Sequence, residues 1–293
     1  MDFAVFLVQC LNAVQYGLLL FLVASGLTLI FGILGVINLA HGSFYMIGAY
    51  LAYALAPWAA AHLGGGFFTA LVIGLVLSVI FGYLLEWGFV SYLYHREHLQ
   101  QVLMTYGLIL VLEELRSILV GDDVHGVAPP PWLAGSIPLG GVMSYPVYRL
   151  FISGVCIVVA LGLYAVIART RLGMAIRAGA SNREMVQSLG VDIRLLYRIV
   201  FAAGVALAVF AGMIAAPVSS VYPGMGNQVL IVSFVVVVIG GIGSIRGALL
   251  ASLLVGVVET FGNVFSPQVA GMLVYVLMAM ILLWRPEGLF RTS

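Results

Sequence analysis

The sequence contains no lysine and few charged residues of any kind. Its 293 residues carry 12 arginines and 11 acids, so only 8% of the chain is charged, whereas a soluble domain has about 25%. Hydrophobic residues make up 63% of the chain. A protein in water needs a polar surface, and too few polar side chains are present to form one. The composition therefore excludes an ordinary soluble domain.

The missing lysine has a second consequence. A Walker A loop ends in a lysine, so we expect no ATP site of that kind and no cofactor on this chain. The net charge of +1 argues against a nucleic-acid partner, which requires a concentrated basic face. Cys10 and Cys156 lie inside apolar runs and are expected to be packing residues. No metal-ligand or catalytic constellation is evident, so we expect no enzyme.

The few charges are distributed unevenly. Residues 3–85 and 199–245 contain no formal charge at all, which fits a chain that crosses a bilayer several times. Divided at charges, prolines and glycine clusters, the chain has nine apolar segments: 6–34, 39–56 (ended by Pro57), 67–93, 102–120, 146–168, 199–216, 229–240, 248–265 and 269–284. We expect one all-α domain over residues 1–293, a polytopic transmembrane helix bundle of about 8 to 10 spans. The segment 229–240 is only half a span, which predicts one or two broken or re-entrant helices.

The arginines indicate which ends face the cytoplasm. Six of them lie in the loop 169–198, namely Arg169, Arg171, Arg177, Arg183, Arg194 and Arg198. Basic loops stay on the cytoplasmic side, so this loop is expected inside. Alternation of the spans then places the loop 121–145 outside and the C-terminus inside.

Two polar or glycine-rich stretches interrupt the apolar segments. The first contains Asn38, His41, Gly42 and Ser43, with Gly35 shortly before them. It fits either a helix break that lines a substrate path or a short interfacial turn with His41 at headgroup level. The second, residues 240–247, contains Gly240, Gly241, Gly243 and Gly247. It fits either a helix break with close helix packing or a tight cytoplasmic turn.

Three acidic positions need an explanation. Glu259 lies in the middle of the apolar segment 248–265, and Glu86 lies deep in the segment 67–93. Ionised carboxylates at such positions are expected to face the bundle interior or to have a partner. Glu113 is expected to form a local pair with Arg116 at spacing i,i+3.

The basic loop contains a short predicted helix at residues 181–190. Ser181 or Asn182 would cap its start and Gly190 would end it, with Met185, Val186 and Leu189 on one side. Exposed apolar side chains among arginines fit a docking element for a soluble partner. A helix that lies on anionic lipid is the alternative.

Three stretches together resemble one family, the integral-membrane permeases of branched-chain amino acid ABC importers (the Liv type). They are Phe31-Gly32-Ile33-Leu34-Gly35-Val36-Ile37-Asn38-Leu39-Ala40-His41-Gly42, the run 240–247 followed by Gly256-Val257-Val258-Glu259, and Arg285-Pro286-Glu287-Gly288-Leu289-Phe290. Their order and spacing are similar to the family's over nearly the whole chain. The basic loop resembles the family's coupling loop, with matches at Arg183, Glu184 and Gly190. Met185-Val186 stands where a small residue is common, which implies a bulkier fit.

The resemblance implies an assembly and a role for each stretch. A second homologous permease subunit, or a copy of this chain, would complete the pathway, with two cytoplasmic ATPase subunits that bind ATP and an extracytoplasmic binding protein, in the inner cell membrane. Asn38, His41, Gly42, Ser43 and Glu259 would belong to the substrate pathway. Gly35, Gly240, Gly241, Gly243 and Gly247 would serve helix breaks and packing. Arg183, Glu184, Met185, Leu189 and Gly190 would contact the ATPase.

The resemblance leaves the substrate open. A branched-chain amino acid delivered by the binding protein is the first expectation, and urea, amides or other small solutes are the alternative within the family. Selectivity would then come largely from the binding protein. A secondary transporter independent of ATP is the runner-up, and it would need an intramembrane charged site, for which Glu259 and Glu86 are the candidates.

Overall fold

The computed structural model describes residues 3–94, 96–139 and 143–290. Residues 140–142 of the predicted external loop and 291–293 of the C-terminal tail lie outside the described residues. In chain order the elements are α1 (Phe3–Leu34), α2 (His41–His62), α3 (Gly66–Gly88), the 3₁₀ helix η1 (Val90–Leu93), α4 (His98–Val120), the 3₁₀ helix η2 (Pro131–Leu133), β1 (Ser136–Leu139), β2 (Met143–Pro146), α5 (Val147–Arg169), α6 (Arg171–Ser181), α7 (Arg183–Ser188), α8 (Ile193–Ala215), α9 (Met225–Gly240), α10 (Ile245–Phe265) and α11 (Ala270–Trp284).

Each predicted apolar segment corresponds to a helix, α1 to α5 and α8 to α11. Within the described residues, α1, α2, α3, α5, α8 and α10 are long and apolar enough to cross a membrane. The helices α9 and α11 are shorter, with 16 and 15 residues. Helix α4 is continuous over 23 residues, but the charged Glu113, Glu114 and Arg116 interrupt its apolar sequence. The predicted fold class, a polytopic helical membrane bundle, is confirmed.

Two details differ from the prediction. Pro57 does not end its helix but lies inside α2, which continues to His62. A proline removes one backbone hydrogen bond, and packed membrane helices tolerate this because neighbouring groups satisfy the freed carbonyl. The loop 121–145 also contains a small antiparallel hairpin, in which Ser136 pairs with Pro146 and β1 lies beside β2.

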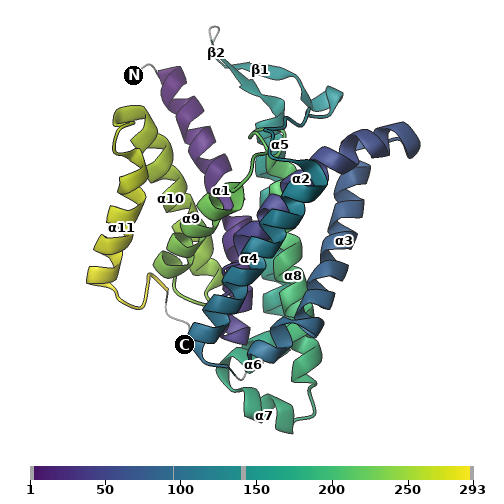
Figure 1. The fold of residues 1–293 in the computed structure, drawn as a ribbon. Coiled ribbons are helices and arrows are strands. Elements are labelled where there is room, and N and C mark those ends of the chain that lie inside the picture. Colours follow the sequence, from purple (N-terminus) through teal and green to yellow (C-terminus); the bar gives the residue numbers. More distant parts are fainter. Residues whose placement is uncertain (1–2, 95, 140–142, 291–293) are drawn as a thin grey trace.

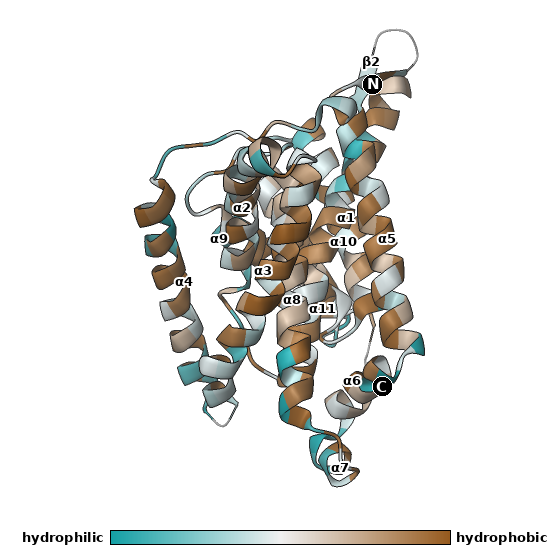
Figure 2. Cartoon of the chain, turned by 90° about the vertical axis from the view of Figure 1, so that its right-hand side faces the viewer, coloured by the Kyte–Doolittle hydropathy of each residue, from teal (hydrophilic) through white to brown (hydrophobic). Residues whose placement is uncertain are grey.

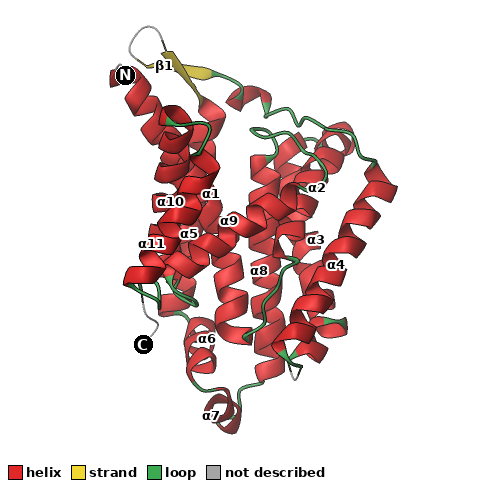
Figure 3. Ribbon diagram, turned by 60° about the vertical axis from the view of Figure 1, so that its left-hand side comes forward, coloured by secondary structure: helices red, strands yellow, loops and turns green. Residues whose placement is uncertain are grey.

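Helices α1 and α8 form the centre of the bundle. Helix α1 packs against α5, α8, α9 and α10, while α2 and α3 pack on α8, and α4 stands at the outside (Figure 3). Glycines allow the backbones to approach: a Cβ at Gly48 would collide with the carbonyl of Val209, and one at Gly26 would lie 2.6 Å from the Gly204 oxygen. Such small-residue contacts are what membrane helices use to pack without a hydrophobic driving force.

The bundle has two distinct ends (Figure 1). The hairpin β1–β2 and the start of α1 lie at one, called the hairpin end below. Helices α6 and α7 and the C-terminal segment lie at the other, called the α7 end. Apolar residues dominate the helices between them, and polar residues gather on α6 and α7 (Figure 2). The basic loop and the C-terminal segment therefore share one end, opposite the loop 121–145.

Candidate functional site

The chain between α1 and α2 turns back into the bundle. Helix α1 ends at Leu34 and residues 35–40 form a non-helical segment. His41, which begins α2, is fully buried, and its Nε2 lies 3.0 Å from the carbonyl oxygen of Val23. Val23 precedes the end of α1 by 11 residues, or roughly 16 Å along a helix. The start of α2 therefore lies inside the bundle rather than beside the end of α1.

We call residues 35–40 the return segment, and Asn38 stabilises it with two hydrogen bonds. Its side-chain oxygen accepts a hydrogen bond from the Ala40 amide at 3.1 Å, and its own carbonyl accepts one from the His41 amide. Asn38 and Ser43 are buried as well. Of the two alternatives for this stretch, the structure has a helix break, and His41 is enclosed by protein rather than exposed at a surface.

Helix α9 also begins inside the bundle, against the first turn of α2. A Cβ at Gly42 would collide with the carbonyl of Gly226, and one at Gly226 would lie 2.5 Å from the Gly42 oxygen. Two helix N-termini therefore meet in backbone contact. The short segment predicted at 229–240 is thus the greater part of α9, a half-length helix of 16 residues.

A polar cavity of about 480 Å³ opens at the hairpin end. We call it the outer cavity. It is lined by Gln9, Asn12, Gln15, Tyr16, Leu19, Tyr45, Arg149, Ala215, Val218, Ser219, Glu259, Thr260, Asn263 and Val264. Glu259 is therefore a cavity residue, and its Oε2 atom is buried without a hydrogen-bond partner, while the Tyr16 hydroxyl lies against the carboxylate. Tyr45, one turn after Gly42, is on the wall.

Of the residues that line the outer cavity, the sequence predicted Glu259 alone as part of the substrate pathway. Asn38, His41, Gly42 and Ser43 are absent from its lining, and five side chains of α1 that were not predicted are present. Gln9, Asn12 and Tyr16 recur at spacing i, i+3, i+7, which places them on one face of the helix. That polar face in an uncharged segment was the available signal. Arg149 gave none, because it joins the cavity only through the fold.

The first stretch, the glycine run 240–247 and the C-terminal stretch pack against one another at the α7 end. A Cβ on Gly32 would lie 2.7 Å from Cα of Gly243, and one on Gly288 would lie 2.7 Å from Cα of Gly241. The C-terminal stretch also caps α9: the Leu289 amide donates to the carbonyl of Ile239 at 2.8 Å, and the Phe290 amide to that of Gly240 at 3.3 Å. The last carbonyls of a helix lack intrahelical partners, so these bonds fix the end of α9.

The glycines of the second stretch have separate tasks. Gly241 and Gly243 have φ of 93° and 81°, values that favour glycine. Gly240 and Gly247 pack backbone to backbone, because a Cβ on either would collide with the other. A tight turn and a close helix contact therefore coexist here.

Helix α7 has the predicted ends. The Asn182 side chain accepts from the Met185 amide at 3.0 Å, and Gly190 follows with φ of 85°. Met185 and Leu189 are 60% and 76% exposed, and Glu184 is exposed as well. Val186, predicted on the same side, is instead buried. It turns inward because the short helix must pack its own apolar residue against the bundle.

Arg183 joins α7 to the return segment. Its Nη2 lies 2.8 Å from the position that a Cβ on Gly35 would occupy, and Gly35 has φ of 67°. The guanidinium also stacks over the Tyr197 ring, with Cζ 5.8 Å from the centroid. Helix α7 therefore contacts the turn after α1 through this side chain.

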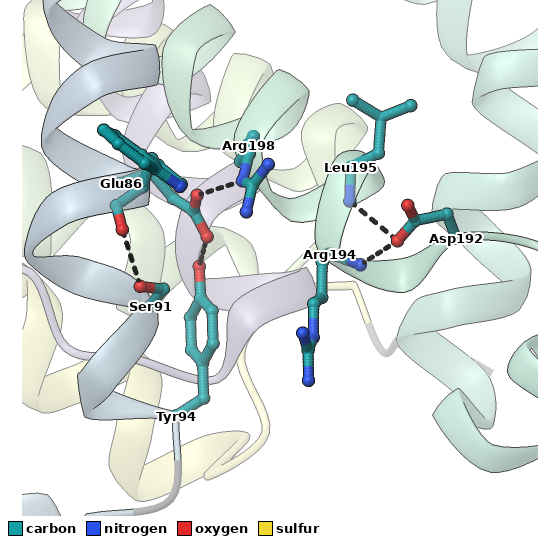
Figure 4. A network of polar contacts seen from close by, with 8 residues as sticks. Glu86, Ser91, Tyr94, Asp192, Arg194, Leu195 and Arg198 are labelled. Atoms are coloured by element: carbon teal, nitrogen blue, oxygen red, sulfur yellow. Dashed lines mark hydrogen bonds and ion pairs between the residues drawn. The ribbon is translucent and has the colours of Figure 1, made fainter.

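Glu86 has the partner that its position required (Figure 4). Its Oε2 lies 3.3 Å from Nε of Arg198, and Tyr94 donates to its Oε1 at 2.6 Å. Burial, and then the adjacent carboxylate, raise the pKa of Tyr94, so the phenol remains a donor. The Tyr94 ring packs edge-on against Tyr197 at 5.0 Å. These contacts tie α3 and the chain after it to the start of α8.

The start of α8 is fixed separately. The Asp192 side chain accepts from the amides of Arg194 and Leu195 at 2.9 and 3.1 Å (Figure 4), which is the bonding expected of a helix cap.

The predicted local pair of Glu113 with Arg116 does not form. Arg116 pairs with Asp122 at 2.8 Å, and Glu113 accepts from Asn227 at 3.0 Å. The hydrogen bond from Arg116 lowers the pKa of Asp122. Arg116 prefers this partner because its guanidinium also reaches the Gly121 carbonyl, which the end of α4 leaves free.

A bundle of apolar helices long enough to span a membrane, with two helix starts buried inside it, a cavity at each end and the short exposed helix α7 at one end, is the architecture of a polytopic membrane protein of the kind that transports solutes. Comparison with known proteins makes this specific. A family model described as "Branched-chain amino acid transport system / permease component" matches residues 9–283. The chain therefore belongs to this family, whose members are transport subunits and not enzymes.

Individual relatives agree with the family model. The permease protein BraD of a high-affinity branched-chain amino acid transport system in Pseudomonas aeruginosa is 33% identical, over 97% of this chain and 95% of its own. The corresponding LivH of Escherichia coli K12 is 28% identical, over 98% and 96%. LivM of the same organism is 26% identical, over 90% of this chain and 66% of its own. No solved structure matches this chain.

Proposed function

We propose that this chain is the membrane-spanning permease subunit of an ATP-driven importer of branched-chain amino acids. The observation that carries the proposal is the pairing of family membership over residues 9–283 with a polar cavity built into the apolar bundle. Two similar proteins, BraD and LivH, are named for high-affinity branched-chain amino acid transport. The chain catalyses no covalent reaction and binds no cofactor in this role.

The partners follow from the two ends. Similarity to both LivH and LivM supports a pair of homologous permease subunits around one pathway. The exposed Met185 of α7 and Leu189 just after it would fit a groove on one ATPase subunit. The second permease subunit would dock on a second ATPase in the same way, and the two ATPases would bind the ATP. Six arginines at this end favour its cytoplasmic placement, in the inner cell membrane. The hairpin end would then receive the substrate-binding protein.

The path would run along α1. Five residues of α1 between 9 and 19 line the outer cavity, and five between 28 and 33 line an inner cavity of about 820 Å³ at the α7 end. Between them α1 is closed in by its neighbours, since residues 20–27 are all buried. Glu259 lies at the outer entrance. Asn38, His41, Gly42 and Ser43 form the buried segment below Tyr45, where the contact of Gly42 with Gly226 would be the gate.

The motion that ATP drives in the ATPases would be transmitted from α7 to this gate. Closure of the ATPase pair would shift α7, and Arg183 would carry the shift to Gly35 and the return segment. The start of α2 would then move relative to α9, because Asn38 ties the segment to Ala40 and His41. Such rigid-body motion of packed elements between two states is a common way of alternating access.

Reconstitution tests the proposal. The permease pair and its ATPases are placed in proteoliposomes, and uptake of labelled L-leucine is measured with the binding protein added outside. We expect Leu189→Asp and Glu184→Ala to abolish uptake and to release the ATPase on affinity purification, while Arg171→Ala, an exposed arginine of the same loop, retains both. Leucine uptake by the permease without its ATPases would refute the importer and favour a secondary transporter.

A further inference from the structure

The outer cavity contains one charge of each sign. Glu259 enters it from α10 and Arg149 from the first turn of α5. Over the part of the chain that the structure describes, the ion pairs are Arg116 with Asp122 and Arg198 with Glu86. Neither cavity charge belongs to one, so the two are not bonded to each other. Glu259 lies within the apolar helix α10, where a carboxylate without a counter-charge is costly, and the unbonded cation in the same cavity points to a ligand that carries both charges.

Both charged groups are held in position by neutral neighbours. Nη1 of Arg149 donates to the Asn12 side chain at 2.6 Å. The Tyr16 hydroxyl lies against the Glu259 carboxylate, whose Oε2 is buried without a partner. Asn12 and Tyr16 are one turn apart on α1. The helix thus presents one side chain to the cation and the next to the anion, and leaves acceptor and donor capacity free on both.

The rest of the wall is divided by polarity. Gln9, Gln15, Thr260 and Asn263 supply neutral polar groups, while Leu19, Val218 and Val264 supply an apolar surface. The volume, about 480 Å³, lies within the range of roughly 300–1,000 Å³ typical of small-molecule sites. A ligand that fits this wall has a positive group, a negative group and a compact aliphatic part.

We propose that the outer cavity is a binding site for a zwitterionic α-amino acid with an aliphatic side chain. Arg149 holds the α-carboxylate, because a guanidinium can bind both oxygens of a carboxylate, and Glu259 holds the α-ammonium. The inference rests on the proposed function and adds to it that the permease itself reads both charges of its substrate. Urea and simple amides carry neither charge, and they would leave both residues uncompensated, so the site rejects them.

Direct binding tests this without the binding protein. The permease–ATPase complex in nanodiscs is titrated with radiolabelled L-leucine, and two analogues compete: 4-methylpentanoate, which lacks the ammonium, and 3-methylbutylamine, which lacks the carboxylate. For the wild type we expect L-leucine to compete at least tenfold better than either analogue. Arg149→Gln is expected to weaken leucine and 4-methylpentanoate tenfold or more and to leave the amine unchanged. Glu259→Gln is expected to weaken leucine and the amine and to leave 4-methylpentanoate unchanged.

The crossed pattern separates recognition from folding. A structural role alone would weaken all three ligands together, and Glu114→Gln, an exposed acid on α4, serves as the neutralised control with wild-type binding. The wild-type ligand series remains decisive if a variant fails to assemble. No saturable leucine binding, or equal competition by leucine and its analogues, overturns the site. If wild-type proteoliposomes import leucine while binding lacks this pattern, the site fails and the importer stands. If they do not import it, the proposed function fails.

Discussion

Single glycines in this bundle differ sharply in what they permit. Gly212 faces the backbone of α2 so closely that a Cβ would collide with the Tyr45 carbonyl, whereas a Cβ on Gly154 of α5 would have no heavy atom within 4 Å. Both lie inside apolar helices. The conformational preference of alanine over glycine in a helix is the same at both sites, so the difference between them measures packing.

We predict opposite effects of the same substitution at these two positions. Gly212→Ala forces α2 and α8 apart and should lower stability by about 1–3 kcal/mol, the usual cost of overpacking. Gly154→Ala should be neutral or slightly stabilising. Thermal midpoints of the purified complex in detergent check this. A Gly212→Ala protein as stable as the wild type would show that the helices are less closely packed than described.

The Glu86–Arg198 pair allows an ordering to be predicted. Glu86 is 1% exposed and Arg198 is 25% exposed. Removing Arg198 leaves a buried carboxylate with Tyr94 as its remaining donor, whereas removing Glu86 leaves a cation that can still reach water. Arg198→Gln should therefore destabilise more than Glu86→Gln, the first by about 3 kcal/mol. The double variant should cost less than the sum. Thermal midpoints of the four proteins decide it, and the reverse order would contradict the burial difference.

At the residue level the sequence identified which carboxylates require a partner, but it did not identify the partner residues. Glu86 and Glu259 stood out because carboxylates in apolar segments require an explanation. Their surroundings could not be derived, since Arg198 is 112 positions from Glu86 and Arg149 is 110 positions from Glu259. The pair predicted by local spacing, Glu113 with Arg116, was wrong, because a helix end offered Arg116 a carbonyl and a carboxylate together.

Among the elements, capping and helix-ending residues in the sequence predicted where helices end, but they did not predict what each helix packs against. The Asn182 cap and the Gly190 stop of α7 were readable, since both act within a few residues. The inward turn of Val186 was not, because it depends on what the helix packs against. The helix end predicted at Pro57 was wrong for the same reason. Proline disfavours a helix locally, but the neighbours packed around α2 allow the helix to continue through it. The C-terminal stretch showed a family pattern, but its contact with α9 is visible only in the fold.

That contact predicts a role for Gly288. Its φ of 81° and its approach to Gly241 within 2.7 Å of a Cβ position both exclude a larger residue without strain. Gly288→Ala should displace the Leu289 and Phe290 amides from the end of α9 and lower stability by about 1–3 kcal/mol. Gly271→Ala in α11, where a Cβ meets nothing within 4 Å, is the matched control. Hydrogen exchange at residues 236–241 should increase in the first variant and stay at the wild-type level in the second.

For the whole molecule, the charge pattern predicted the class of protein, whereas the two cavities along α1 are visible only in the fold. Long uncharged segments and a clustered set of arginines sufficed for a polytopic bundle with two unlike ends. These patterns did not reveal that α1 lines one cavity at the hairpin end and another at the α7 end, because helices distant in sequence contribute to the lining of each cavity. Two cavities separated by a closed stretch of one helix are the arrangement expected of alternating access, in which one opens as the other closes.

This arrangement makes a labelling prediction. Thr260 lines the outer cavity and Ala180 the inner one, so single cysteines are placed at each position with Cys10 and Cys156 replaced by serine and alanine. In proteoliposomes of known sidedness, a membrane-impermeant maleimide should reach Thr260→Cys only from the side of the binding protein and Ala180→Cys only from the side of the ATPases.

ATP with vanadate should change the two labelling rates in opposite directions, because a single motion about the Gly42–Gly226 contact opens one cavity while it closes the other. A cysteine in place of Asp123, which is exposed in the loop after α4, should keep a constant rate. Labelling of Ala180→Cys from the binding-protein side would reverse the assigned orientation, and rates that change in parallel would refute a gate between the cavities.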